Sequence, residues 1–427
     1  MTKLQKRTTI ALSIWLASIL TGGIAVGIAH LTLYVQKAYF AFAHINPYWT
    51  LFASPLLFVL ATFIIKKFAP EATGSGIPQV LAVLENSKNS NQSEGVWLSP
   101  LISIRSSLFK LLSILAGMLG GASVGREGPT VQIAASIFAY VGRRMRKFFP
   151  HLDFQAYLTA GAGAGVAAAF NTPLAGIMFA LEEIAEGVLG HSKSVVMVGV
   201  VIAGLTAQSF LGDYLYFGHP NVTGTLGLFI LQAVLLGSIG GLAGGCLARA
   251  VSHPFFPTMN VLLRSFICGC VCALIAFFAH QDSAGSGYEV TRRALESASN
   301  DQLGYSFPLE KFAATVFSYQ SGMAGGIFAP ILSLGAGIGL ALAKLLSFAN
   351  FKSWALIGMV AVFGGTIQAP LTAVVIVMEM TDERSLVLPF IIAAFLGQAV
   401  GRIFMPVPLY RFLVERAFRN TGAQAKA

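Results

Sequence analysis

A single carboxylate stands among glycines at the point where an apolar segment begins. The pentapeptide Gly125-Arg126-Glu127-Gly128-Pro129 follows a glycine-rich apolar run over residues 116–124 and precedes another apolar run over residues 130–141. Proline is tolerated in the first turn of a helix, so Pro129 predicts a helix start here. A helix N-terminus has unpaired N–H groups and a partial positive charge, and therefore attracts anions. We interpret Glu127 as an anion that the protein itself carries, in a position that a diffusing anion could also take.

The composition excludes an ordinary soluble globular protein. Of the 427 residues, 55% are hydrophobic and only 11% are charged, and the mean hydropathy is +0.72. Two apolar stretches, at residues 74–84 and 369–380, are short and interrupted by Gly or Pro, which indicates discontinuous helices. Longer apolar runs that predict membrane-spanning helices lie at residues 9–34, 51–65, 195–210, 226–250, 261–279 and 385–404. The expected fold class is an all-α multi-pass membrane protein, in which an ionisable side chain such as Glu127 marks a pathway or a partner.

The net charge of +10 does not indicate a nucleic-acid partner, because the basic residues gather at the ends of apolar segments. They cluster at Lys66-Lys67, at residues 143–147, and at three arginines near the C-terminus, Arg411, Arg416 and Arg419. By the positive-inside rule, these loops and both termini are expected to lie in the cytoplasm. The first apolar run is too long for a secretory signal and is followed by no small-residue cleavage site, so we expect a spanning helix.

We expect no metal, no cofactor and no enzymatic activity. The seven histidines lack metal-ligand spacing, and the four cysteines lie inside apolar runs, in a pattern that fits neither a zinc site nor a disulfide framework. An intramembrane enzyme with Ser75 or Ser321 as nucleophile is the alternative from another functional class. However, no histidine or lysine is obviously placed to activate either serine, and no His-Glu-x-x-His motif occurs. The alternating Gly and Ala of residues 161–165 predict close helix packing.

The second half of the chain repeats the order of motifs in the first half. The matching pairs are separated by 211, 201 and 197 positions: Gly74-Ser75-Gly76 with Gly285-Ser286-Gly287, the Glu127 pentapeptide with Gly326-Ile327-Phe328-Ala329-Pro330, and Thr172-Pro173-Leu174 with Ala369-Pro370-Leu371. This order predicts an internal duplication, with repeats at residues 1–215 and 216–410 and a short cytoplasmic tail at residues 411–427. Broken segments at equivalent positions of two halves point to a substrate site at the repeat interface.

The repeat also separates two classes of carboxylate. Glu182 and Glu379 occupy equivalent positions, so we expect both to accept hydrogen bonds from backbone N–H groups of an interrupted helix. Glu183 aligns with Met380, and Glu127 aligns with Phe328. Because Glu127 and Glu183 break the symmetry, they are the stronger functional candidates.

Over nearly its whole length, the chain resembles the CLC family of chloride channels and chloride/proton antiporters. The motifs that begin at Gly74, Gly125 and Gly326 match the three anion-site signatures of the family in order, and Tyr410 matches a fourth. The resemblance implies a homodimer in a bacterial inner membrane, surrounded by lipid, with one pore per subunit and a fold of two inverted repeats with broken and tilted helices. Only seventeen residues follow Tyr410, so we expect neither the nucleotide-binding modules of many relatives nor regulation by nucleotide.

By the same resemblance, the hydroxyls of Ser75 and Tyr410 and the backbone N–H groups of Ile327 and Phe328 bind the central chloride. Several partial charges bind an anion strongly enough for entry and weakly enough for release. Ser75 could instead be a helix cap, and Tyr410 an aromatic side chain at the membrane interface. Positions expected to support the anion site through the backbone are Gly74, Gly76, Arg126, Gly128 and Gly326, and the Arg126 side chain is expected to be structural.

The resemblance further implies that Glu127 is a gate that competes with chloride when ionised and swings away when protonated. Glu183 matches the inner proton-transfer glutamate, although it could instead pair with Lys193. The presence of both carboxylates favours chloride/proton antiport over a passive chloride channel, the closest alternative. Retention of Ser75 and Tyr410 disfavours a fluoride exporter, and a serine rather than a proline at position 75 disfavours nitrate preference.

Overall fold

The computed structural model describes residues 3–89, 98–149, 152–185, 193–212, 215–348 and 350–424. Within these ranges the chain folds into helices joined by short loops, with two isolated β-bridges and no β-strand. Seven of the described helices are long and apolar enough to cross a membrane. The structure therefore confirms the predicted all-α membrane fold class.

The first half of the chain supplies the helices that begin near the Gly74 and Glu127 motifs. A single turn of π-helix, η3 (Ala180–Ile184), follows the short helix α8. The α-helices of this half are α1 (Lys3–Ile45), α2 (Tyr48–Phe68), α3 (Ile77–Asn89), α5 (Ile104–Leu119), α6 (Glu127–Arg146), α7 (Phe154–Phe170), α8 (Pro173–Phe179) and α9 (Lys193–Leu211).

The second half supplies the helix that begins at Phe328 and the helix that carries Tyr410. A short 3-10 turn, η4 (Arg384–Leu386), joins α16 to α17. The α-helices of this half are α10 (Leu226–Ser252), α11 (Val261–Phe278), α12 (Tyr288–Glu296), α13 (Phe307–Gln320), α14 (Phe328–Leu345), α15 (Phe351–Ile367), α16 (Pro370–Thr381), α17 (Val387–Phe404) and α18 (Leu409–Gln424).

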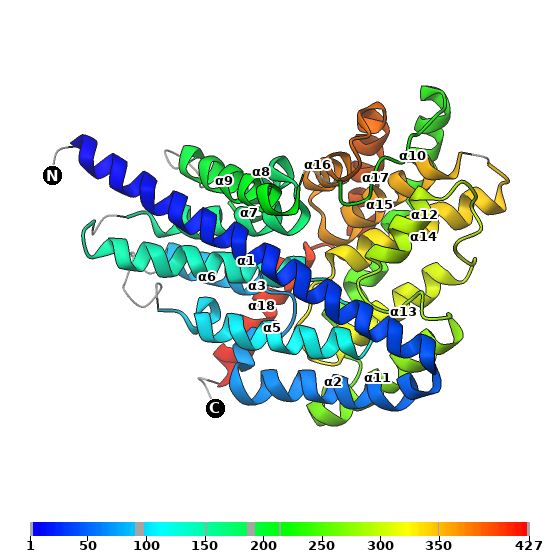
Figure 1. The fold of residues 1–427 in the computed structure, drawn as a ribbon, viewed down its shortest axis with the longest axis horizontal. Helices are drawn as coiled ribbons and strands as arrows, with labels where there is room; N and C mark the ends of the chain where they lie inside the picture. The colour runs from blue at the N-terminus through cyan, green and yellow to red at the C-terminus, as the bar shows by residue number, and fades with distance from the viewer. Residues whose placement is uncertain are drawn as a thin grey trace.

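Helix α1 is longer than its apolar run predicted. Its 43 residues correspond to a rise of about 65 Å, roughly twice the thickness of the bilayer hydrocarbon core. Neither Gly nor Pro interrupts residues 28–46, and the first proline of the chain is Pro47, so the helix continues past the apolar run. Figure 1 shows α1 crossing the face of the molecule diagonally. A helix of this length fits a bilayer by tilting or by extending beyond it.

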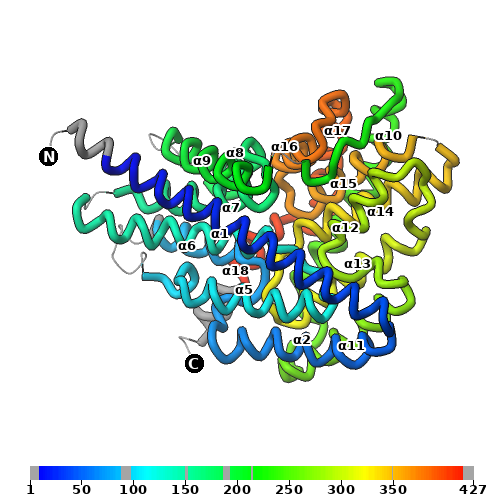
Figure 2. Tube along the Cα trace, viewed as in Figure 1, coloured from blue at the N-terminus to red at the C-terminus, as the bar shows by residue number. Residues whose placement is uncertain are grey.

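The helix contacts repeat between the two halves. Helix α6 packs on α7, which also contacts α8 and α9, and α14 packs in the same way on α15, which contacts α16 and α17. Figure 2 shows these two groups on opposite sides of the molecule. Helix α18 contacts α3 from the first half and α10 and α15 from the second. The predicted duplication is therefore present in the packing, and Tyr410 enters between the halves.

Two glutamates, Glu182 and Glu379, each cap the N-terminus of a helix in the opposite half of the chain and so connect the two halves. The Glu182 carboxylate accepts hydrogen bonds from the backbone N–H groups of Leu371 (3.1 Å) and Thr372 (2.6 Å) and from the Thr372 hydroxyl (2.7 Å) at the start of α16. The Glu379 carboxylate accepts from two N–H groups at the start of α8, at 3.1 and 2.8 Å. The predicted role of this pair is confirmed. Glu182 follows the end of α8 and meets the start of α16, and Glu379 lies in the last turn of α16 and meets the start of α8. Helices α8 and α16 therefore run antiparallel, as inverted repeats require.

Candidate functional site

Backbone hydrogen bonds join the loops in front of α3, α6 and α14. The Gly74 N–H donates to the Met323 carbonyl at 3.2 Å, and the Gly325 N–H donates to the Gly74 carbonyl at 3.1 Å. Gly125 and Gly326 exchange two N–H to carbonyl bonds, at 2.7 and 2.9 Å. These contacts hold three helix N-termini together, although the loops come from distant parts of the chain. The first N–H groups of a helix lack intrahelical acceptors, so the three starts form a concentrated region of partial positive charge.

Three polar side chains that the sequence singled out are buried at this junction. Ser75, Glu127 and Tyr410 are each at most 1% exposed. Their side-chain oxygens have no hydrogen-bond partner among the residues that the structure describes. The Ser75 hydroxyl and the Glu127 carboxylate each lie near enough to the Tyr410 hydroxyl to interact with it electrostatically. Because an unsatisfied buried polar group costs about 1–3 kcal/mol, two convergent hydroxyls without a protein acceptor form a suitable cradle for an anion.

Glycines allow the backbone of these loops to approach so closely. Gly76 has φ +112°, a conformation that L side chains rarely adopt. A Cβ added at Gly128 would overlap the Ser75 hydroxyl oxygen. Gly128 therefore keeps the space beside Ser75 free of a side chain.

The Glu127 carboxylate lies at the beginning of α14. It folds back over Gly125, where an added Cβ would meet it, and it lies near the backbone of Ala329 in the first turn of α14. In this position the carboxylate occupies a place where the helix dipole stabilises negative charge. The neighbouring Arg126 side chain turns away, because its Nη1 donates to the Ala29 carbonyl at 2.8 Å and to the Thr32 hydroxyl at 3.2 Å. The Arg126 side chain is therefore bonded to α1 and not directed at the anion-site loops.

Glu183 lies on the π turn η3 and is 5% exposed. It belongs to a different element from Glu127, yet its carboxylate also interacts electrostatically with the Tyr410 hydroxyl. The two asymmetric carboxylates therefore lie on separate elements, Glu127 on α6 and Glu183 on η3. Single π turns within helices are frequent at functional sites.

The Phe328 ring orients the Tyr410 side chain. It contacts the Tyr410 ring at a centroid distance of 6.1 Å and the Phe363 ring at 5.0 Å. On its other sides it meets Phe170 at 6.3 Å and Phe179 at 5.9 Å. The aromatic packing around Phe328 therefore restricts where the Tyr410 hydroxyl can point.

Two buried lysines near the glycine loops were missed by the sequence analysis. The ammonium of Lys110 donates to the Gly74 carbonyl at 2.8 Å, and that of Lys311 donates to the Gly285 carbonyl at 2.8 Å and to the Ser283 carbonyl at 3.1 Å. Both side chains are fully buried. Their separation of 201 positions equals that of Glu127 and Phe328, so the repeat could have identified them. Each lysine donates to the carbonyl of the first glycine in one Gly-Ser-Gly loop.

A cavity of about 690 Å³ reaches the junction at Gly74. Tyr319 and Gln320 line it, together with two cationic side chains, Arg264 and Arg416. Such a cavity is large enough for hydrated ions, and its two arginines outnumber its one carboxylate, Glu71, which favours anions.

The family model described as "Voltage gated chloride channel" matches residues 56–402. The H(+)/Cl(-) exchange transporter ClcA of Cronobacter sakazakii is 32% identical, over 88% of this chain and 81% of that protein. The protein of the same name from Salmonella paratyphi B is 30% identical, over 88% of this chain and 80% of that protein.

Solved structures show the same fold. A slow cyanobacterial Cl-/H+ antiporter superposes with a TM-score of 0.78 and 25% identity, over 96% of this chain and 97% of that one. A CLC-type fluoride/proton antiporter has a TM-score of 0.77 and 23% identity, over 97% of this chain and 99% of that one. Membership in a family of transporters confirms that the chain is not an enzyme. The chain is a multi-pass integral membrane protein that belongs to the CLC family, the voltage gated chloride channel family.

Proposed function

We propose that this protein exchanges chloride for protons across the membrane, with Glu127 as the gate common to both ions. The observation that carries the proposal is the group of buried oxygens of Ser75, Tyr410 and Glu127, which have no hydrogen-bond partner among the described residues and lie where three helices begin. The names of the relatives, which are H(+)/Cl(-) exchange transporters, support the same pair of ions.

The central chloride binds between the Ser75 and Tyr410 hydroxyls and the backbone N–H groups of Ile327 and Phe328. These donors carry partial charges only, whereas the Lys110 ammonium is occupied by the Gly74 carbonyl and the Arg126 guanidinium by Ala29 and Thr32. A site built from dipoles releases an anion faster than one built from a full cation at contact distance.

The two ions are coupled because the ionised Glu127 carboxylate and chloride compete for the same place at the start of α14. A proton removes the charge of the carboxylate and with it the attraction to the helix N-terminus. The carboxylate then leaves, and chloride takes its place. Glu183 passes protons between the cytoplasmic side and Glu127, by a route separate from the chloride cavity at Gly74.

The protein functions in this proposal as a homodimer in a bacterial inner membrane, with both termini in the cytoplasm. The basic ends of the apolar segments, such as Lys66-Lys67 after the main part of α2, support this orientation. Each subunit has a complete anion site, since the four predicted binding residues come from one chain.

Paired flux measurements test the proposal. The purified protein is reconstituted into liposomes with an outward chloride gradient, and external chloride and external pH are recorded together. Antiport moves protons against their own gradient when chloride leaves, whereas a passive channel moves chloride alone. Chloride efflux from wild-type liposomes without coupled proton movement would establish the channel alternative.

The variants Glu127→Gln and Glu183→Gln assign the two carboxylates. Both should retain chloride flux and lose chloride-driven proton movement, because Gln cannot carry the proton. Glu296→Gln is the matched control, since Glu296 is an exposed acid that pairs with Arg292 on the surface, and it should retain coupling. Proton movement that persists in Glu127→Gln would refute the gate assignment.

A further inference from the structure

A second, smaller cavity adjoins the Glu127 carboxylate and shares no lining residue with the large cavity at Gly74. It has room for about one water molecule. Its walls come from α1, α5, the Glu127 pentapeptide, the loop before α10, and the loop before α12 with the first residue of that helix. The polar residues that line it are Thr32, Gln36, Arg126, Glu127, Tyr216, Ser286 and Tyr288. The Glu127 carboxylate therefore faces a small polar cavity whose other lining residues, except Arg126, lie outside the anion-site motifs.

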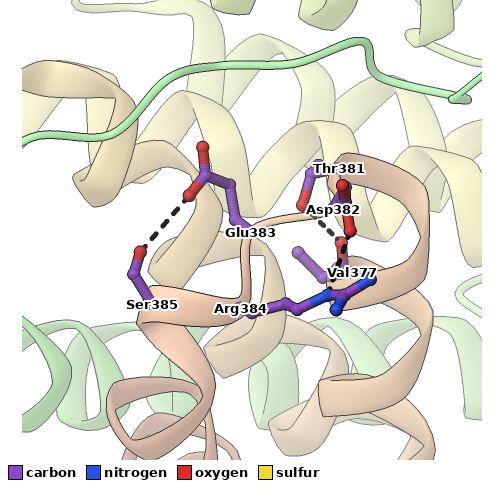
Figure 3. Close-up of polar contacts among 6 residues, drawn as sticks. All are labelled: Val377, Thr381, Asp382, Glu383, Arg384 and Ser385. Atoms are coloured by element: carbon purple, nitrogen blue, oxygen red, sulfur yellow. Dashed lines mark hydrogen bonds and ion pairs between the residues drawn. The ribbon is translucent and has the colours of Figure 1, made fainter.

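Tyr216 is held in this space by the loop that follows α9. The N–H of Phe217 donates to the Met380 carbonyl at 3.1 Å, and the N–H of Val222 donates to the Glu383 carboxylate at 3.1 Å. Figure 3 shows the corner that receives the loop, where the other Glu383 oxygen accepts from the Ser385 hydroxyl at 3.3 Å. The loop is thus fixed at two points to the end of α16 and the turn after it.

Aromatic packing fixes the direction of the Tyr216 side chain. Its ring lies 4.5 Å from the Tyr288 ring and 5.5 Å from the Phe170 ring, and Phe170 in turn stacks on Phe328. Tyr216 is only 2% exposed, so its ring has little freedom to turn away. The same row of rings that orients Tyr410 therefore extends to Tyr216 on the far side of Phe170.

The hydroxyl of Tyr216 lies close enough to the Glu127 carboxylate to interact with it electrostatically. The other charged or titratable groups near this carboxylate are Arg126, Tyr288 and Tyr410. Arg126 is engaged by the Ala29 carbonyl, and the Tyr288 hydroxyl accepts a hydrogen bond from Arg292 at 2.9 Å. Of the two tyrosines in the small cavity, Tyr216, and not Tyr288, is among the groups that interact with the Glu127 carboxylate.

We propose that Tyr216 is a positioning residue for the gate: its hydroxyl, which lines the same small cavity, is placed to donate a hydrogen bond to the ionised Glu127 carboxylate and so to hold it at the start of α14. The carboxylate oxygens have no hydrogen-bond partner among the residues that the structure describes. This inference rests on the proposed gate role of Glu127. A donor to the charged form favours that form, and it also sets the pH at which the carboxylate takes up a proton. Tyr216 thereby adjusts how readily external protons open the path to chloride.

The test is the dependence of chloride flux on external pH in liposomes, for Tyr216→Phe in the wild-type and Glu127→Gln backgrounds, because chloride flux is retained in both. Tyr216→Phe keeps the ring and its packing and removes only the hydroxyl. In the wild-type background the midpoint of the pH profile should move by about one unit toward higher pH, the size expected for the loss of one hydrogen bond to a charged group. Tyr288→Phe is the matched control, and its midpoint should remain at the wild-type value.

In the Glu127→Gln background no ionised carboxylate remains, so adding Tyr216→Phe should leave the pH profile unchanged. An unshifted midpoint in the wild-type background would overturn the inference. An equal shift in both backgrounds would also overturn it, because the tyrosine would then act independently of the gate. Failure of the gate proposal itself is distinguishable, since Glu127→Gln alone would then still move protons.

Discussion

Replacing Glu182 by alanine should destabilise the protein more than replacing its symmetry partner Glu379. Glu182→Ala removes the acceptor of three hydrogen bonds, two of them partly buried bonds from Thr372. Hydrogen bonds to charged groups contribute about 1.5–3 kcal/mol each. Water replaces the exposed bond, so the two partly buried bonds, at the lower end of this range, give an expected loss of about 3 kcal/mol. Glu379→Ala removes one partly buried and one exposed bond, for an expected loss of about 1.5 kcal/mol.

The assay is thermal unfolding in detergent at one fixed scan rate, followed by tryptophan fluorescence. The expected order of midpoints is Glu182→Ala lowest, then Glu379→Ala, then the wild type. Glu296→Gln is the control for loss of an acidic side chain, because an exposed ion pair contributes about 1 kcal/mol or less. Reversal of the order of the two alanine variants, or a Glu182→Ala midpoint equal to that of the control, would refute the reasoning about shared caps.

Two substitutions test the anion site directly. Gly128→Ala introduces a Cβ that overlaps the Ser75 hydroxyl oxygen. Chloride flux should therefore fall at least about tenfold, while size-exclusion behaviour stays normal. Flux near the wild-type value would show that this space is not part of the chloride path. Ser75→Ala should loosen selectivity among anions, measured as a change in reversal potentials, and unchanged selectivity would remove Ser75 from the site.

Much of the site could be predicted from the sequence because its motifs combine glycine, proline and one polar residue at helix starts. The starts of α6 and α14 at Glu127 and Phe328 follow from Pro129 and Pro330, each the third residue of its helix. The shared capping role of Glu182 and Glu379 followed from their equal positions in the repeat. Local backbone chemistry decides the helix starts, whereas the caps join distant segments and were predictable only because the repeat places both carboxylates at equivalent positions.

Other features depend on contacts between distant segments, which local patterns do not record. Tyr216 lies in the polar break between the repeats, and only the packing of its loop against Met380 and Glu383 brings it to the gate. Lys110 is a cation in an apolar segment, and in the sequence it looks like a lysine that anchors a helix at the membrane interface. In the structure its ammonium is fully buried and donates to the Gly74 carbonyl. The apolar run at residues 9–34 is shorter than α1, because hydropathy marks only the part of a helix that suits lipid. The helix itself continues until a helix breaker such as Pro47.

The exchange of caps between α8 and α16 has a consequence for how such a chain could have arisen. A half-length chain alone would have a carboxylate with no helix start to receive it and a helix start with no carboxylate. Two identical half-length chains inserted into a bilayer in opposite orientations would satisfy both needs at once. The reciprocal bonds of Glu182 and Glu379 are therefore what an ancestral pair of antiparallel subunits would have left behind after gene fusion.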